Sequence, residues 1–531
     1  MELCRGQMMC MTHPLRLALV VLCFALPLAT PLWAQDEDPW SALIIEGQTL
    51  LQAVDPAAAL ELFHAAREIV EAEHRDDEDV IVTATSLGLA YGAMGEFTRA
   101  VEQHTLSLEL RIASYGEPSQ AVAIGLRHLA KVMQNQALYA DTSTLLNRAL
   151  TNLEGIGEGE GADAMAIRAD LASIYYAVAR YDDALALYED LLAEARHGSP
   201  EGHVSLMIGA AAVHEAMERP VLARNLLDEA LIIARSELPA PHPEAASVLN
   251  RLGESLRHQG RSEEALLYYE EALAMRLMLY GETDSRVAPV LNNIGLAYFN
   301  LGRLAEARLR LDAALLVTTS VFGNRHPAVA IVLGNLADVL EAQGELLEAV
   351  EANQFAMLVL EAANGTGHPE VARLRASFGR RLLAGGVTEL AEPELAAALD
   401  VLESTFGRQH GDVAAVLASQ AELARLNGDF DAAVALNMEA GDILQAVGLG
   451  ESLDMADVLE ARAETLMITR QLEDATDLYA EALAIREAQL GADNPRLAPL
   501  LRDYAFALRR LQETALAEEM EGRAAALEVA D

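Results

Sequence analysis

Residues 249–281 read LNRLGESLRHQGRSEEALLYYEEALAMRLMLYG, and residues 291–323 read LNNIGLAYFNLGRLAEARLRLDAALLVTTSVFG. The two segments align without a gap at an offset of 42 residues, so that Gly253 matches Gly295 and Ala265 matches Ala307. Large apolar residues recur at helical spacing on both sides of a central glycine. The segment therefore predicts a helical hairpin, and its repetition predicts stacked hairpins, because one hairpin cannot bury its apolar face alone.

The register continues along the chain as three columns of small residues. The first column, here called the reference position of each repeat, holds Gly47, Gly88, Ala130, Ala172, Ala211, Gly253, Gly295, Ala337, Gly379, Ala421, Ala463 and Ala505. Twelve residues further on, eleven of twelve residues are Ala, and seven beyond that, ten of twelve are Ala. Two helices approach closely only where side chains are small, so we expect each reference residue to face the first Ala column across its hairpin.

The pattern L-x-x-L-G-x-x-Y/L, followed by Ala, an aromatic residue or Leu, and a second Ala, resembles the tetratricopeptide repeat. The period of 42, the joint Phe322-Gly323-Asn324-Arg325-His326-Pro327 and the Leu291-Asn292-Asn293-Ile294 motif are similar to the kinesin light chain subtype. This resemblance implies an all-α, right-handed α-solenoid of about twelve hairpins over residues 40–531. It also implies that the first helices line a concave face that binds protein partners or extended peptide segments.

Two further columns predict how the helices end and begin. Glycines recur seven residues after the reference position, where they can end the first helix in a left-handed conformation: Gly95, Gly260, Gly302, Gly344, Gly386 and Gly428. His242, His326, His368 and His410 recur at the joints between repeats, with Asp284 and Asn494 in equivalent places. Pro follows several of them, so we interpret this column as helix initiation rather than as a set of metal ligands.

The N-terminal segment predicts export. Residues 1–34 carry basic residues, a short apolar run from Leu17 to Leu28 and Ala34, which together indicate a secretory signal peptide, and residues 35–39 form a short acidic segment. All three cysteines lie in residues 1–34, so the mature chain is expected to lack disulfides and thiolate sites. For a bacterial protein, the expected location is the periplasm or the medium.

Charge and motifs exclude several classes of function. The formal charge of −43 argues against nucleic acid as a partner, and no stretch of the mature sequence is long and apolar enough to span a membrane. Lys131 is the only lysine and no GK[ST] surrounds it, which excludes a P-loop, and neither GxSxG nor HExxH occurs. We therefore expect no catalytic activity, no cofactor and no metal, with an enzyme site in the groove kept as a remote alternative.

The candidate binding site lies on the concave face. In each repeat we assign five positions to this face: three and two residues before the reference residue, and one, four and five residues after it. Over all repeats these positions carry equal numbers of basic and acidic residues. In the kinesin light chain-like repeats that the sequence resembles, groove asparagines are implied to bind peptide backbone, because an amide both donates and accepts. The candidate residues are Asn250, Arg251, Arg257, Asn292, Asn293, Tyr298, Asn300 and Asn335. The open alternative is that these amides bond within the solenoid.

Two functions fit these observations. The first is an exported, non-catalytic scaffold or adaptor that binds partners along its concave face. The second is a peptide-sensing regulator whose superhelix responds to its ligand. The oligomeric state does not follow from these residues.

Overall fold

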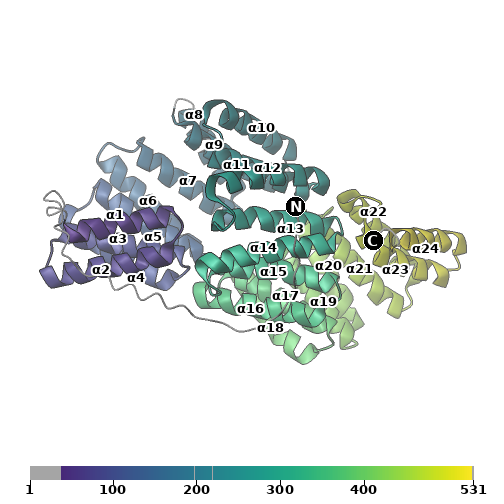
Figure 1. Ribbon diagram of the computed structural model, residues 1–531. Coiled ribbons are helices and arrows are strands. Elements are labelled where there is room, and N and C mark those ends of the chain that lie inside the picture. Colours follow the sequence, from purple (N-terminus) through teal and green to yellow (C-terminus); the bar gives the residue numbers. More distant parts are fainter. Residues whose placement is uncertain (1–37, 196–197, 218, 529–531) are drawn as a thin grey trace, which may run out of the picture.

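The computed structural model describes residues 38–195, 198–217 and 219–528. These residues form 24 α-helices and two short 3₁₀ helices, η1 (Ser285–Val287) and η2 (Pro495–Leu497), with no β-strand among them. The helices pair in sequence order into twelve antiparallel hairpins, each joined by a short turn (Figure 1). The all-α fold that the repeat predicts is confirmed over the described part of the chain.

The first helices of the hairpins are α1 (Pro39–Gln52), α3 (Asp77–Ala93), α5 (Gln120–Asn135), α7 (Ala162–Ala177), α9 (Pro200–Ala216), α11 (Pro243–His258), α13 (Ala288–Asn300), α15 (Pro327–Ala342), α17 (Pro369–Ala384), α19 (Gly411–Leu426), α21 (Leu453–Ile468) and α23 (Ala498–Arg510). The second helices are α2 (Pro56–Glu73), α4 (Phe97–Tyr115), α6 (Tyr139–Gly155), α8 (Tyr181–Ala195), α10 (Pro220–Glu237), α12 (Ser262–Tyr280), α14 (Leu304–Phe322), α16 (Leu346–Asn364), α18 (Thr388–Phe406), α20 (Phe430–Ala446), α22 (Leu472–Leu490) and α24 (Thr514–Glu528).

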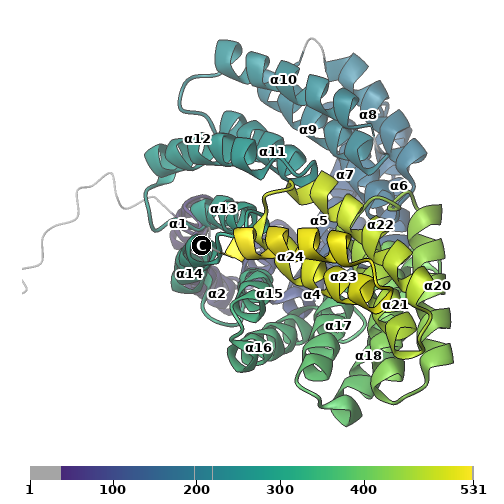
Figure 2. The same ribbon diagram turned by 90° about the vertical axis from the view of Figure 1, so that its right-hand side faces the viewer.

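The hairpins stack into a coiled solenoid with an inside and an outside. In Figure 2, the second helices α10, α12, α16 and α18 lie on the outside, and their partners α9, α11, α15 and α17 face inward. Each second helix also contacts the first helix of the next repeat. The coil returns on itself, because α4 of the second repeat also contacts α16 of the eighth. The first helices therefore form the concave wall that the resemblance implies.

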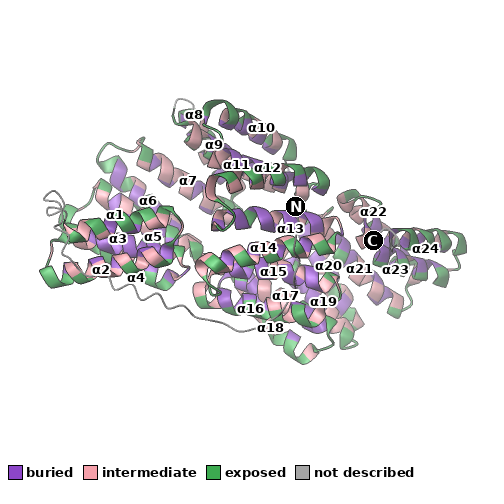
Figure 3. Ribbon diagram, in the orientation of Figure 1, coloured by how far each residue is buried: buried purple, intermediate pink, exposed green. Residues whose placement is uncertain are grey.

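Buried residues recur along the packed helices (Figure 3), and the two Ala columns are among the most buried of them. Every residue of the first Ala column is at most 1 % exposed, and every residue of the second is at most 2 % exposed. The reference residue faces the backbone of the first Ala column, since a Cβ on Gly295 would lie 3.3 Å from the oxygen of Ala307. The nearest atoms belong to the side chain one turn further on, and a Cβ on Gly253 would lie 2.6 Å from the Tyr269 ring. Helical side chains lean toward the N-terminus of their own helix, so the residue one turn beyond Ala265 reaches back over it.

The turn within each hairpin has the left-handed conformation that its glycines predict. The six glycines named above have φ between +73° and +82°. The equivalent residues of five other repeats adopt the same region without being glycine: Val54, Ala137, Ala179, Arg470 and Gln512. The position therefore requires a positive φ whichever residue occupies it, and glycine is the residue that adopts it without strain.

The joint column begins helices, as predicted. The Nδ1 atoms of His242, His326, His368 and His410 each accept a hydrogen bond from the backbone N–H two residues on, at 3.1–3.3 Å. Asp284 and Asn494 accept the equivalent bond through a side-chain oxygen, both at 2.9 Å. A ring nitrogen that accepts carries no proton, so the Nδ1 atoms of His326 and His368 are unprotonated in this arrangement. The joint histidines thus serve as N-terminal caps.

The proposed signal peptide, residues 1–34, lies outside the described residues. Within the described ranges, no helix combines the length and the apolarity that crossing a bilayer requires.

Candidate functional site

Three groups of polar side chains recur at the same three positions of the concave wall. Two residues of each group come from one repeat and lie three residues before and one residue after its reference position. The third comes from the next repeat and lies two residues before its reference position. We call them the N-terminal trio (Arg127, Lys131 and Asp170), the central trio (Asn250, Glu254 and Asn293) and the C-terminal trio (Glu460, Glu464 and Asp503). Since the repeat places each trio in the same geometry, the three can be compared directly.

The central trio is closed by internal hydrogen bonds. The Nδ2 group of Asn250 donates to Glu254 Oε1 at 2.8 Å. The Nδ2 group of Asn293 donates to the same Glu254 oxygen at 2.8 Å and to Asn250 Oδ1 at 3.1 Å. Arg251 donates to the other oxygen of Glu254 at 2.7 Å and also to Glu215 at 2.8 Å. The amides and the carboxylate therefore satisfy one another, and Arg251 shares its positive charge between Glu254 and Glu215.

The other predicted residues divide between this wall and the ends of their helices. Asn335 donates to Asn292 Oδ1 at 2.8 Å, which links α13 to α15 as the central trio links α11 to α13. Arg257 bonds to its neighbour His258 at 2.8 Å. Tyr298 is 8 % exposed, with the guanidinium of Arg303 stacked on its ring. Asn300 is the last residue of α13. The structure thus brings Asn250, Arg251, Asn292, Asn293 and Asn335 into one polar wall, with Arg257, Tyr298 and Asn300 nearer the ends of α11 and α13.

The N-terminal trio is an ion-pair group with an excess of positive charge. Arg127 Nε and Lys131 Nζ approach the two oxygens of Asp170 at 2.6 and 3.1 Å. The side chain of Asp170 is 13 % exposed, whereas that of Lys131 is 63 % exposed. One carboxylate therefore neutralises only one of the two cations.

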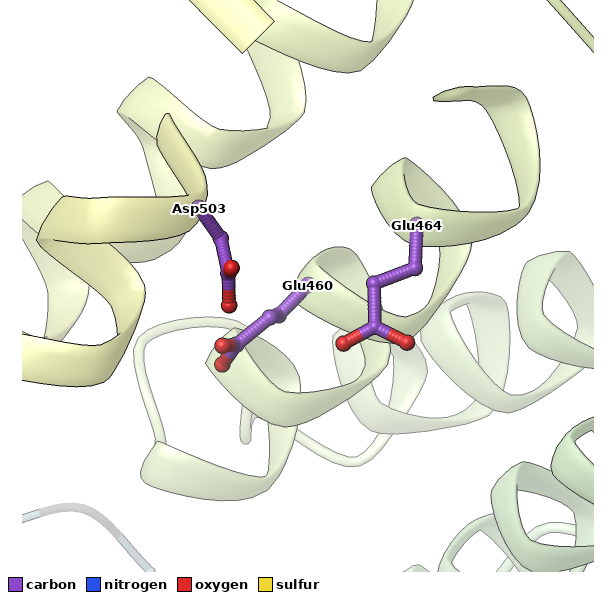
Figure 4. Close-up of side chains that lie close together, drawn as sticks. All are labelled: Glu460, Glu464 and Asp503. Carbon is purple, nitrogen blue, oxygen red and sulfur yellow. The ribbon is translucent and has the colours of Figure 1, made fainter. Parts of the chain in front are cut away.

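The C-terminal trio is entirely acidic. Glu460 and Glu464 project from α21 and Asp503 from the adjacent α23 (Figure 4), and one oxygen of each carboxyl lies within 4.8 Å of the others. Arg486 pairs with Glu460 at 2.5 Å and with Asp457 at 2.7 Å, so this cation is shared. Arg425 lies 3.8 Å from Glu464 and is shared as well, because it pairs with Glu422 at 2.6 Å. Burial raises the pKa of Glu460 to about 7, and the neighbouring carboxylates Asp457, Glu464 and Asp503 add to that rise against the effect of Arg486. Negative charge here exceeds the positive charge that would neutralise it.

A cavity of about 710 Å³ adjoins this trio on the concave face. Its walls come mainly from the first helices α17, α19 and α21, and its charged lining consists of four arginines and six carboxylates: Arg373, Arg380, Arg425, Arg486, Asp412, Glu422, Asp454, Asp457, Glu460 and Glu464. Ion pairs such as Arg373 with Asp412 at 2.7 Å and Arg425 with Glu422 at 2.6 Å satisfy part of this charge. Burial raises the pKa of Asp454, which lies beside further carboxylates. The cavity is polar, with a net excess of acid.

Comparison with known families agrees with the geometry of the hairpins. The family described as tetratricopeptide repeat matches residues 165–203, 204–278, 286–354 and 456–496. The chain is a tetratricopeptide repeat protein. The repeats between these matches follow the same register and form the same hairpins. No curated protein sequence matches the chain significantly.

Solved structures of other repeat proteins are similar to this tetratricopeptide repeat protein. A protein of kinesin light chain nearly identical TPR-like repeats from Podosopora anserina is 19 % identical, with a TM-score of 0.33, over 39 % of this chain and 98 % of the other. BtubC (BKLC) from P. vanneervenii is 20 % identical, with a TM-score of 0.36, over 43 % and 91 %. A Rap protein complexed with Competence and Sporulation Factor is 12 % identical, with a TM-score of 0.44, over 85 % and 98 %.

The sequence contains a signal for the acidic cavity of this tetratricopeptide repeat protein, although none of the eight candidate residues lines it. Glu460, Glu464 and Asp503 occupy the same columns as Asn250, Glu254 and Asn293, so alignment of the repeats alone places three carboxylates together. Basic and acidic residues are equal in number over all concave positions, so the summed charge does not reveal this local excess of acid. The cavity itself depends on the spacing of α17, α19 and α21, which no column of the repeat reveals.

Proposed function

We propose that this tetratricopeptide repeat protein is a non-catalytic scaffold that binds an extended segment of a partner protein along its concave face. A basic side chain of that segment lies in the cavity beside the C-terminal trio. The observation that carries the proposal is this cavity of about 710 Å³, whose carboxylates outnumber its arginines. A Lys or Arg side chain would supply the missing positive charge and relieve the repulsion among carboxylates that are partly removed from water.

The central wall supports a second part of the same proposal. Asn250, Asn292, Asn293 and Asn335 follow the wall at the spacing of the repeats, and their amides retain further donor and acceptor capacity beyond the bonds described above. An extended segment that leaves the cavity toward the N-terminus would pass these amides. We propose that they bind its backbone, while the basic side chain in the cavity fixes its register.

A peptide-array experiment tests the proposal. Immobilised peptides of varied sequence are probed with the wild-type protein and with the Glu460→Gln, Glu464→Gln double variant. We expect the wild type to select peptides that contain Lys or Arg, and the double variant to lose that preference and at least tenfold of its affinity for them. The matched control, Glu473→Gln, changes an exposed carboxylate on α22 and should select the same peptides as the wild type. Selection of acidic peptides, or equal selection by the wild type and the double variant, would contradict the proposal.

We also propose that the protein acts outside the cytoplasm, in the periplasm or the medium, after removal of residues 1–34. The support is the short apolar run behind basic residues in the sequence. N-terminal sequencing of the protein recovered from the medium or periplasm tests this part by itself, and product that still begins at Met1 or Met11 would contradict it.

A further inference from the structure

Successive turns of the superhelix contact one another through side chains far apart in the sequence. His326 Nε2 donates to the backbone oxygen of Ala93 at 3.0 Å, and His368 makes the corresponding bond to the backbone of Asn135. Asn494 Nδ2 donates to the backbone oxygen of Asn300 at 2.7 Å. These partners are separated by 233, 233 and 194 residues. The three contacts are equivalent in the repeat, and those of His326 and Asn494 are hydrogen bonds with short donor–acceptor distances.

The repeat explains why the three bonds are equivalent. Each donor is the joint residue that precedes a first helix, and each acceptor is the last residue of a first helix in the preceding turn: α3, α5 or α13. The carbonyl groups in the last turn of a helix have no partner within it. The joint side chain therefore caps two helices at once, since it accepts from its own helix and donates to the end of a distant one.

The tautomer of the two histidines follows from this double role. Nδ1 accepts the capping bond, so the proton must lie on Nε2, the atom that faces the other turn. Burial lowers the pKa of His326 and lowers that of His368 to about 4, which keeps both rings in this neutral form at physiological pH.

The surfaces that meet are shaped for close approach. A Cβ on Gly95 would lie 2.4 Å from Pro327, and a Cβ on Gly260 would lie 2.0 Å from the backbone oxygen of Gln489. Gly344, Gly386 and Gly428 occupy the equivalent position in later repeats, and a Cβ there would meet no described atom within 4 Å. At Gly95 and Gly260 the lack of a side chain therefore permits contact between turns. All five of these glycines also have a positive φ.

Two further contacts join successive turns along the same boundary, which we call the seam. Asn364 Nδ2 donates to the backbone oxygen of Asn135 at 3.1 Å, and the guanidinium of Arg496 lies 4.4 Å from the centre of the Phe299 ring. An apolar cavity of about 450 Å³ remains beside His326 and His368, between residues of α1–α5 and residues of α14–α17. Apolar packing between the turns is limited, as between Ala363 of α16 and the core of the first two repeats. The turns are thus joined mainly by discrete contacts around a space, so they can separate without unfolding a hairpin.

We propose that His326, His368 and Asn494 are latches that hold successive turns of the superhelix together and thereby set the pitch and width of its concave groove. Opening the latches would lengthen the superhelix while every hairpin stays intact, which gives the solenoid two shapes. This inference concerns the chain alone and does not depend on what the groove binds.

The decisive variant removes the donors and keeps the caps. In the triple variant His326→Asp, His368→Asp, Asn494→Asp, each new carboxylate can still accept from its own helix, as Asp284 does at 2.9 Å. It has no hydrogen to donate, and its charge is repelled by the negative end of the distant helix. The matched control is His242→Asp, His410→Asp, because these two joint histidines cap their helices and make no hydrogen bond to another turn among the described residues.

Small-angle X-ray scattering then measures the shape, and circular dichroism measures the helix content. We expect the triple variant to keep the helix content of the wild type and to show a larger radius of gyration and maximum dimension, while the control scatters like the wild type. Scattering of the triple variant that equals that of the wild type would overturn the proposal. Equal expansion of the control would also overturn it, because the effect would then come from altered capping.

Chemical cross-linking provides an independent measurement. Cys4, Cys10 and Cys23 are the only cysteines of the sequence, so the full chain with serine at these positions accepts a designed pair without competition. Asn135→Cys and Asn364→Cys place two thiols across the seam, within reach of a short bismaleimide. We expect efficient cross-linking in the otherwise wild-type chain and a several-fold loss when the three latch substitutions are added. Equal cross-linking in both chains would contradict a role of the latches in closure.

Discussion

The central trio and the C-terminal trio occupy the same positions of the same repeat, yet their electrostatics are opposite. Asn250, Glu254 and Asn293 satisfy one another through hydrogen bonds of 2.8–3.1 Å. Glu460, Glu464 and Asp503 are three carboxylates whose oxygens lie within 4.8 Å, and the arginines that pair with Glu460 and Glu464 are shared with other carboxylates. The backbone of the solenoid therefore repeats the same three positions, and the residues at these positions decide whether their polar groups satisfy one another or leave an excess of charge.

This contrast has an energetic consequence. Replacing an amide by a carboxylate that is partly withdrawn from water costs free energy unless a cation neutralises it. The raised pKa of Glu460 is the sign of such a cost, since burial disfavours its charged form. If the C-terminal trio binds a basic side chain as proposed, stability and binding oppose each other there, as is common at binding sites.

The largest expected effect comes from converting the central trio into a copy of the C-terminal one. Asn250→Glu with Asn293→Asp places three carboxylates beside the single charge of Arg251. We expect the free energy of unfolding to fall by about 2–4 kcal/mol at pH 8, with much of the loss recovered at pH 5, where the new carboxyls can bind protons. Urea unfolding at the two pH values measures this. Asn147→Asp on the exposed surface of α6 is the control and should change stability by less than about 0.5 kcal/mol.

The reverse exchange should stabilise the protein. The pKa of Glu460 is raised from 4.5 to about 7, so its contribution to stability is complete below pH 4.5 and is lost as the pH rises through 7. Glu460→Gln with Asp503→Asn removes that loss, and we expect a gain of about 1–3 kcal/mol at pH 8 that shrinks toward zero at pH 5. Thermal melts at both pH values measure the difference. A gain independent of pH would show that the carboxylate charges are not its cause.

The smallest effect is expected where amides are removed without adding charge. Asn292→Ala with Asn293→Ala deletes the bonds to Asn250, Glu254 and Asn335, at about 0.5–1.5 kcal/mol for each net hydrogen bond. The higher helix propensity of Ala returns several tenths of a kcal/mol for each residue. We expect a net loss of about 1 kcal/mol, seen as a slightly lower melting temperature. A variant as stable as the wild type would mean that these amides serve binding alone.

Much of the fold could be predicted from the sequence because the same residue pattern recurs in twelve repeats. The Ala columns mark the points where helices touch, the glycine column marks a positive φ, and the joint column marks helix starts, each through local geometry that one repeat already contains. The asparagines of α11, α13 and α15 were placed together by the same register. The side chain nearest to the reference residue comes from one turn beyond the first Ala column, because side chains lean along a helix toward its N-terminus.

The sequence by itself determined the hairpins, their order and the face on which each column lies, because these depend on residues less than one repeat apart. Only the tertiary structure decided how tightly the superhelix coils, since small rotations between neighbouring repeats add up over many repeats. That sum brings His326 to Ala93 and Asn494 to Asn300, and it opens the cavity beside Glu460. The contacts that form the latches and the acidic cavity join residues that lie between one and nearly six repeats apart in the sequence. At that range local sequence rules no longer specify which residues meet.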